Sequence, residues 1–230
     1  MNRFRIAILG GTLFVSAFLL FVCQPMVGKM LLPYLGGAAA VWTTCVLFFQ
    51  FMLLLGYVYA HLLSRIGSVR KQMLTHIFVL LLPFAFLPIR FGAVSTESLS
   101  LHPSAQLLLL LTTSVAVPFF VVSATAPLVQ NWFSQSRHES SSDPYFLYSA
   151  SNAGSLLALM AYPFIIEPHV GVTAQTRIWA FGYRALLMLL ILTVVALREA
   201  QARQRAASRR EAQARQRAAS RNRLPLQLST

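Results

Sequence analysis

Polar side chains recur inside two long apolar stretches of this chain, and their types suit hydrogen bonding to a small solute. In the first stretch, Thr43, Gln50 and Tyr57 follow one another at intervals of seven residues, and His61 comes four residues later. Residues three, four and seven apart share one face of a helix. The spacing therefore predicts a stripe of hydroxyl, amide, phenol and imidazole groups along an otherwise apolar helix.

A second polar stripe begins at residue 145. Its members are Tyr145, Tyr148, Ser149, Asn152 and Ser155. Another flank of the same stretch carries Ala150, Gly154 and Ala158 at intervals of four, a ridge of small residues that lets a neighbouring backbone approach closely. We expect this stretch to be a tightly packed interior helix.

The other reactive side chains do not form a catalytic or metal-binding pattern. Cys23 and Cys45 both fall within apolar stretches, where we expect small, buried and unpaired side chains. His76 has no obvious second ligand and is expected to be a hydrogen-bonded interior residue. No carboxylate lies near the middle of an apolar stretch, which disfavours an ion pump. We therefore expect no catalytic residue, no metal site and no cofactor.

The elements that position these residues are six apolar stretches of near-bilayer length, in a chain that is 57% hydrophobic and 11% charged, with a mean hydropathy of +0.63. A hydrocarbon core of about 30 Å takes roughly 20 helical residues. The stretches are Ile6–Val27, Ala38–Leu62, Met73–Ile89, Gln106–Val129, Tyr145–Ile166 and Ile178–Leu197. We expect an all-α polytopic transmembrane bundle of about six spans over residues 1–197.

The fourth stretch is unusual. Its apolar pattern continues from Gln106 to Phe133, and both Pro118 and Pro127 lie inside it. Proline removes a backbone donor and kinks or breaks a helix. The break either borders a polar cavity, as the broken helices of transporters do, or serves plain packing.

Basic residues predict the orientation in the membrane. Arg3, Arg5, Arg65, Arg70, Lys71 and Arg137 fall in the joins on one side, and Lys29, Arg90 and Arg177 fall on the other. Cytoplasmic loops carry the excess of Lys and Arg. The bias predicts that both termini lie in the cytoplasm.

The C-terminal segment 198–230 is a basic duplication. Arg198–Arg209 and Arg210–Arg221 both read REAQARQRAASR, and they account for much of the net charge of +13. We expect a cytoplasmic tail that is either a frayed extension of the last span or disordered. It could contact anionic lipids, bind nucleic acid, or only reinforce the topology; nucleic acid is the weakest of these because no aromatic residues are interleaved with the arginines.

Three blocks of sequence carry a resemblance to a known family. They are QPMVGKMLLPYLGGAAAVWTTCVLFFQFMLLLGYVYAH at 24–61, PFFVVSATAPLVQNWF at 118–133 and DPYFLYSASNAGSLLALMAYPFIIEP at 143–168. The chain resembles the membrane region of fused MFS/spermidine-synthase-like bacterial proteins. In that family, a multi-span membrane region precedes an aminopropyltransferase-like domain. The resemblance therefore implies that this chain is a multi-pass region of the inner (plasma) membrane, MFS-like and transporter-like. No glycine-rich nucleotide-type loop followed by an acidic residue is present here, so we expect no enzymatic activity from this chain.

Three functional readings follow from the resemblance. As a transporter-like module, the chain would line a polar cavity with Gln24, Gln50, Tyr57, His61, Tyr148 and Asn152. Six spans would make one MFS-like half, which needs a homodimer partner or a second half to enclose a path. The solute is open: a polyamine is suggested by the family name and disfavoured by the lack of mid-span acids. Alternatively, the chain is a non-transporting scaffold for a separate synthase-like subunit, or an inactive fragment.

Overall fold

The computed structural model describes residues 3–91, 102–135 and 145–223. In these ranges the chain is helical and contains no strand. Its elements are α1 (Arg3–Leu35), α2 (Ala39–Ser64), α3 (Val69–Leu81), η1 (Leu82–Ala85), α4 (Pro103–Ser114), α5 (Ala116–Ser134), α6 (Tyr145–Ala161), η4 (Tyr162–Ile166), α7 (Glu167–His169) and α8 (Val172–Arg223). The all-α prediction is confirmed for the described residues.

Five helical segments are long and apolar enough to cross a membrane. They are Ile6–Leu35, Ala39–Ser64, Ala116–Ser134, Tyr145–His169 and Val172–Glu199. The chain is therefore a multi-pass helical membrane protein. The expected number of about six spans is met only in part, because one expected span is shorter than predicted.

The shorter element is the third apolar stretch, expected at Met73–Ile89. The α-helix α3 has 13 residues, and the chain then tightens into the 3₁₀-helix η1. Pro83 lies in η1 and has no N–H to continue the α-helical ladder. A 3₁₀ turn is a common way to end a helix under that constraint, since its bonds join residues three apart.

The fourth apolar stretch is broken, as the prolines predict, and the break lies at Val115. This residue has φ −121° and ψ −26°, between the end of α4 and the start of α5. Pro118 is tolerated in the first turn of α5, but it prevents one continuous helix from α4, because it lacks a donor for the carbonyl of Ser114 and its ring crowds that group. Pro127, by contrast, is accommodated within α5.

The fifth stretch also deviates from a plain α-helix. After Ala161 it widens into the π-helical segment η4, which contains Pro163, and the cap N–H of Glu167 donates to the carbonyl of Tyr162, five residues back. A π-bulge absorbs one extra residue within a helix. The segment then continues through α7 to His169, three residues beyond the predicted end.

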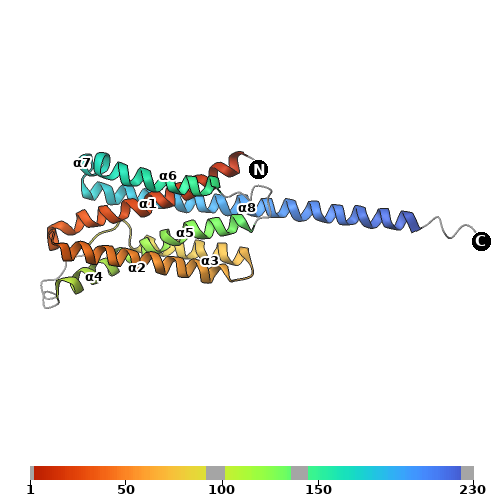
Figure 1. Ribbon diagram of the computed structural model, residues 1–230. Helices are drawn as coiled ribbons and strands as arrows, with labels where there is room; N and C mark the ends of the chain where they lie inside the picture. Colours follow the sequence, from red (N-terminus) through yellow and green to blue (C-terminus); the bar gives the residue numbers. More distant parts are fainter. Residues whose placement is uncertain (1–2, 92–101, 136–144, 224–230) are drawn as a thin grey trace, which may run out of the picture.

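α1 is the central element of the bundle (Figure 1). It packs most extensively against α6, then against α8 and α5, while α2 packs mainly against α5 and α4. Figure 1 shows α6 and α2 on opposite sides of α1. The two polar stripes predicted from the sequence therefore belong to helices that flank the central helix.

Buried side-chain hydrogen bonds tie the helices to α1 and to one another. Thr12 Oγ1 lies 2.8 Å from Thr193 Oγ1 of α8, and Ser16 Oγ donates to the carbonyl of Val122 in α5 at 3.2 Å. Trp179 Nε1 of α8 donates to the carbonyl of Leu19 at 2.9 Å. Interhelical hydrogen bonds of this kind stabilise helix association where the surroundings offer no water.

The last helix extends well past the membrane span. α8 has 52 residues, about 78 Å at 1.5 Å per residue, and its span ends at Glu199. Figure 1 shows the remainder projecting beyond the bundle at the end where α1 begins. The composition changes after Leu197, but the backbone stays helical through Arg223.

Candidate functional site

The expected lining residues of α2 lie on its outer side. Gln50, Tyr57 and His61 are all exposed, and half of the Tyr57 surface is accessible. Their neighbours on the same side are apolar and also exposed, for example Leu47 and Leu54. The stripe predicted by the spacing is therefore an outward-facing stripe in one copy of the chain.

The polar residues of α6 have the same placement. Tyr148 and Asn152 are exposed, whereas Gly154 and Ala158 on the other flank are buried. Gln24, the remaining expected lining residue, is half-buried in α1. α2 and α6 are not among the helix pairs with substantial contact, so one copy does not bring all six side chains together.

The small residues of α6 lie where it crosses α1. A Cβ at Gly154 would meet the backbone of Phe14, and Ala150 Cβ would lie 3.7 Å from a Cβ at Gly10. Ala158 is fully buried. Small side chains let two backbones approach, which increases van der Waals contact along the pair. This crossing is the most extensive helix–helix contact of the described residues.

A buried polar network joins α2, α3 and α5. Gln72 is the central residue: its Oε1 accepts from Trp132 Nε1 at 2.9 Å, and its Nε2 donates to the carbonyls of Ser64 and Ile66 at 3.1 Å and 2.5 Å. The amide thus uses both donor hydrogens and its acceptor to join the α2–α3 turn to α5. Sequence reasoning missed Gln72, because the predicted span began one residue later, at Met73.

His76 continues the same network one turn further along α3. Its Nε2 lies 3.2 Å from Thr125 Oγ1 and its Nδ1 lies 3.5 Å from the hydroxyl of Tyr59. The ring is fully buried and meets Trp132 edge-on. The prediction of a hydrogen-bonded interior histidine is confirmed. These two hydrogen bonds fix the position of α3 against α5 and α2.

A further polar contact closes the opposite end of the bundle. Lys29 Nζ of α1 donates to the carbonyl of Glu167 at 3.0 Å and lies 3.5 Å from its Oε1. Both side chains are partly exposed, so screening keeps the contribution of such a pair to about 0–1 kcal/mol. Its effect is to hold α7 against α1 rather than to create a charged site.

The cysteines and potential metal ligands have no reactive arrangement in the part of the chain that the structure describes. Cys23 and Cys45 are both buried and free, which confirms that prediction. Within the same ranges, no three His, Cys, Asp or Glu side chains come together as metal ligands.

The polar groups of the bundle thus form two classes with different capacities. The buried network uses its donors and acceptors on helix packing, while the stripes on α2 and α6 present theirs outward. Only the second class can meet a solute or another protein. Searches of protein-family models, of curated proteins and of solved structures found no match to this chain.

Proposed function

We propose that the chain is a transporter-like module of a bacterial plasma membrane, and that a polar path is enclosed only when neighbouring membrane subunits cover α2 and α6, which lie on opposite sides of α1 (Figure 1). The observation that carries this proposal is the exposure of Gln50 and His61 on α2 and of Asn152 on α6, all within membrane-spanning segments. Polar side chains at such positions are costly against lipid and normally face protein or a water-filled cavity. Further copies of this chain are the simplest subunits that would supply the cover.

The orientation of the proposed module rests on the charge distribution. Arg65, Arg70 and Lys71 lie at the α2–α3 turn, and Arg70 lies beside Ala202 of the α8 extension at one cavity. The end that bears the arginine-rich helix thus also bears the basic turn. Under the positive-inside bias this end faces the cytoplasm, together with both termini.

The chemistry of the stripes suggests the class of solute. Their amide, phenol and imidazole groups would supply hydrogen bonds, and Tyr57 and Tyr148 could add cation–π contact to an amine. No carboxylate lies on the described faces of α2 or α6 to neutralise a multiply charged cation. A small polar or singly charged solute therefore fits better than a polyamine. We assign no chemical step and no cofactor to the chain.

A second candidate is a membrane scaffold for a separate synthase-like subunit, as the family resemblance implies. The observation that favours it is the α8 extension, a helix that projects beyond the bundle with exposed arginines such as Arg210 and Arg215. Co-purification of a soluble partner that is lost when the extension is removed would support this function over transport.

Thiol accessibility in native membranes tests the transport proposal. In a variant that lacks Cys23 and Cys45, single cysteines are placed at Gln50, Tyr57 and Asn152 and treated with a membrane-impermeant thiol reagent. We expect labelling at all three positions, because a thiol must be hydrated to form the reactive thiolate. Gln50→Ala and Asn152→Ala should lower solute flux in proteoliposomes.

The matched controls are apolar exposed residues of the same bundle. Phe181 and Met188 on α8 are 67% and 65% exposed, and cysteines there should stay unlabelled because lipid covers them. Equal protection of Gln50→Cys and Met188→Cys would mean that lipid or protein, not water, covers the polar stripe. That result would overturn the proposal of a hydrated path.

A further inference from the structure

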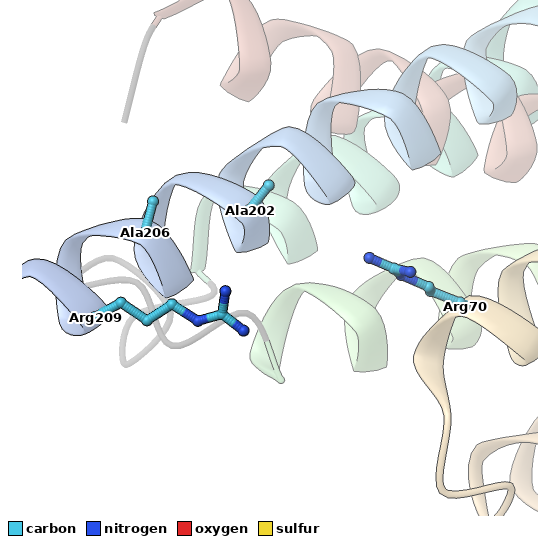
Figure 2. A pocket seen from close by; sticks show the side chains of 4 residues that line it. All are labelled: Arg70, Ala202, Ala206 and Arg209. Carbon is cyan, nitrogen blue, oxygen red and sulfur yellow. The ribbon is translucent and has the colours of Figure 1, made fainter.

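A cavity with two arginines lies between the start of α3 and the extension of α8, outside the polar stripes. It has a volume of about 400 Å³ and is lined by Arg70, Ala202, Ala206 and Arg209. Figure 2 shows the Arg70 and Arg209 side chains reaching toward each other from the two helices. The alanines have the smallest side chains that still favour a helix, so they leave the space open between the two guanidinium groups.

Neither arginine is neutralised by the described part of the chain. The ion pair recorded there is Lys29–Glu167, at the opposite end of the bundle, and neither Arg70 nor Arg209 has a carboxylate partner among the described residues. Two guanidinium groups that point into one space repel each other. An anion between them would remove that repulsion and use their hydrogen-bond donors.

A third arginine precedes the cavity along α8. Arg198 stands on the same stripe of α8, four residues before Ala202, and its Nε is buried without a hydrogen-bond partner. Asn131 Nδ2, near the end of α5, is likewise buried and unpartnered. Trp132 bonds to Gln72, two residues from Arg70, so Asn131 belongs to the same end of the bundle. Buried donors without acceptors are rare. Neither donor lines the cavity, so they show only that this end of the bundle has donor groups in excess of acceptors.

We propose that this cavity binds a phosphate group, with Arg70 and Arg209 as its two bidentate ligands. The planar guanidinium fork matches phosphate geometry, and charge-assisted hydrogen bonds of this type are about twice as strong as neutral ones. Arg70 also belongs to the first turn of α3, where free backbone N–H groups and the helix dipole favour an anion. The inference does not depend on whether the module transports a solute.

The position of the cavity admits two sources of phosphate. Ala202 and Arg209 lie about 8 Å and 18 Å past Leu197 along α8, and the headgroup layer extends about 5–7 Å beyond the hydrocarbon core. The cavity therefore begins near the outer edge of the headgroup layer and continues into the water beyond it. A phosphorylated lipid headgroup could enter from the membrane side. A soluble phosphate ester could enter from the aqueous side.

The duplication in the tail provides a matched control for the test. Arg221 holds in the second copy of REAQARQRAASR the place that Arg209 holds in the first. Arg70→Gln, Arg209→Gln and Arg221→Gln each remove one positive charge from the full chain. Only the first two remove a proposed ligand.

The experiment uses purified full-length protein and two phosphate probes. Native mass spectrometry counts the phosphatidylglycerol molecules retained from nanodiscs, with phosphatidylcholine nanodiscs as reference. In lipid-free detergent, inorganic pyrophosphate is titrated and the thermal midpoint is followed, because a ligand of the folded state raises it. We expect Arg70→Gln and Arg209→Gln each to weaken binding of the active probe about tenfold or more, and Arg221→Gln to leave it near the wild-type value.

Each outcome decides the question. Loss of one retained phosphatidylglycerol without a pyrophosphate effect identifies a lipid headgroup site, and the converse identifies a site for soluble phosphate esters. An equal loss in all three variants would show only diffuse attraction to a basic helix, and it would overturn the proposal. Binding of neither probe by the wild-type chain would overturn it as well. Unchanged thermal midpoints of the unliganded variants exclude misfolding, and the two proposed ligands, Arg70 and Arg209, are both exposed.

Discussion

Gly154 decides how closely α6 can approach α1. A Cβ at this position would overlap the backbone of Phe14, which cannot move aside as a flexible side chain can. We expect Gly154→Ala to lower the free energy of unfolding by about 1–3 kcal/mol through overpacking, despite the better helix propensity of alanine. Thermal or denaturant unfolding in detergent measures the change.

Gly11 provides the control for that substitution. It lies in α1, and a Cβ there would meet nothing within 4 Å. Gly11→Ala should leave stability unchanged or raise it by up to about 1 kcal/mol, because alanine loses less backbone freedom on folding. Equal effects of the two substitutions would refute the close crossing of α1 and α6.

Gln72 holds the α2–α3 turn through an amide that is buried and fully hydrogen-bonded. Replacing Gln72 with leucine leaves Trp132 Nε1 and two backbone carbonyls without their partner. We expect the free energy of unfolding to fall by about 2–4 kcal/mol, as expected for a few orphaned buried polar groups. Thr75→Val, at an exposed position of the same helix, should change it by less than about 0.5 kcal/mol.

Residue spacing predicted which side chains share a helix face but not which way each face points. The seven-residue spacing in α2 and the stripe in α6 are present, yet both stripes face outward in one copy. When both faces of a helix are largely apolar, periodicity does not predict which face turns toward the bundle. The small residues gave a better signal, since close approach requires them whatever the neighbour is.

At the scale of elements, α3 has no extensive contact with any single neighbouring helix, so single hydrogen bonds matter for it. Tyr183 of α8 donates to the carbonyl of Leu80 near the end of α3, at 2.8 Å and fully buried. We expect Tyr183→Phe to speed hydrogen exchange in α3 more than in α1. The reason is that α3 loses its tie to α8, whereas α1 keeps several others.

Tyr57→Phe is the matched control for this prediction. It removes a hydroxyl from an exposed tyrosine, for which no hydrogen bond is recorded in the described ranges. Exchange rates in α3 should stay at the wild-type value. Uniform acceleration of all helices in Tyr183→Phe would indicate global destabilisation and would contradict a local role.

The helices show which of their bounds composition predicts and which it does not. Apolar length located four membrane-crossing helices close to their predicted bounds, because the hydrocarbon thickness fixes their size, but in the fourth stretch the crossing helix begins at Ala116 rather than at Gln106. It overestimated the third stretch, where Pro83 converts the last turn to η1. The break at Val115 was foreseeable in kind from Pro118, but its place follows from a clash with the carbonyl four residues earlier, which composition does not contain.

At the scale of the whole molecule, the two copies of the tail repeat have different surroundings although their sequences are identical. The first copy lines the cavity with Ala202, Ala206 and Arg209, whereas the lining includes no described residue of the second copy. These three residues are exposed, as are the side chains of residues 210–216. The duplication therefore lengthened α8 without adding a described contact to the bundle. Sequence identity between the copies predicts equal helix propensity, and only the position along α8 makes them unequal.

This inequality predicts the result of a truncation after Arg209. Removing residues 210–230 should leave the thermal midpoint unchanged, because the first copy of the repeat and the cavity that it lines with Arg70 remain. A fall of about 2–4 °C would correspond to about 1 kcal/mol in a chain of this size, and it would mean that the second copy packs on the bundle. A cut after Leu197 is the informative comparison: it removes Arg198 and the whole α8 side of the cavity, so Arg70 loses its facing partner. If phosphate retention survives the first truncation and is lost in the second, the function of the tail resides in its first copy.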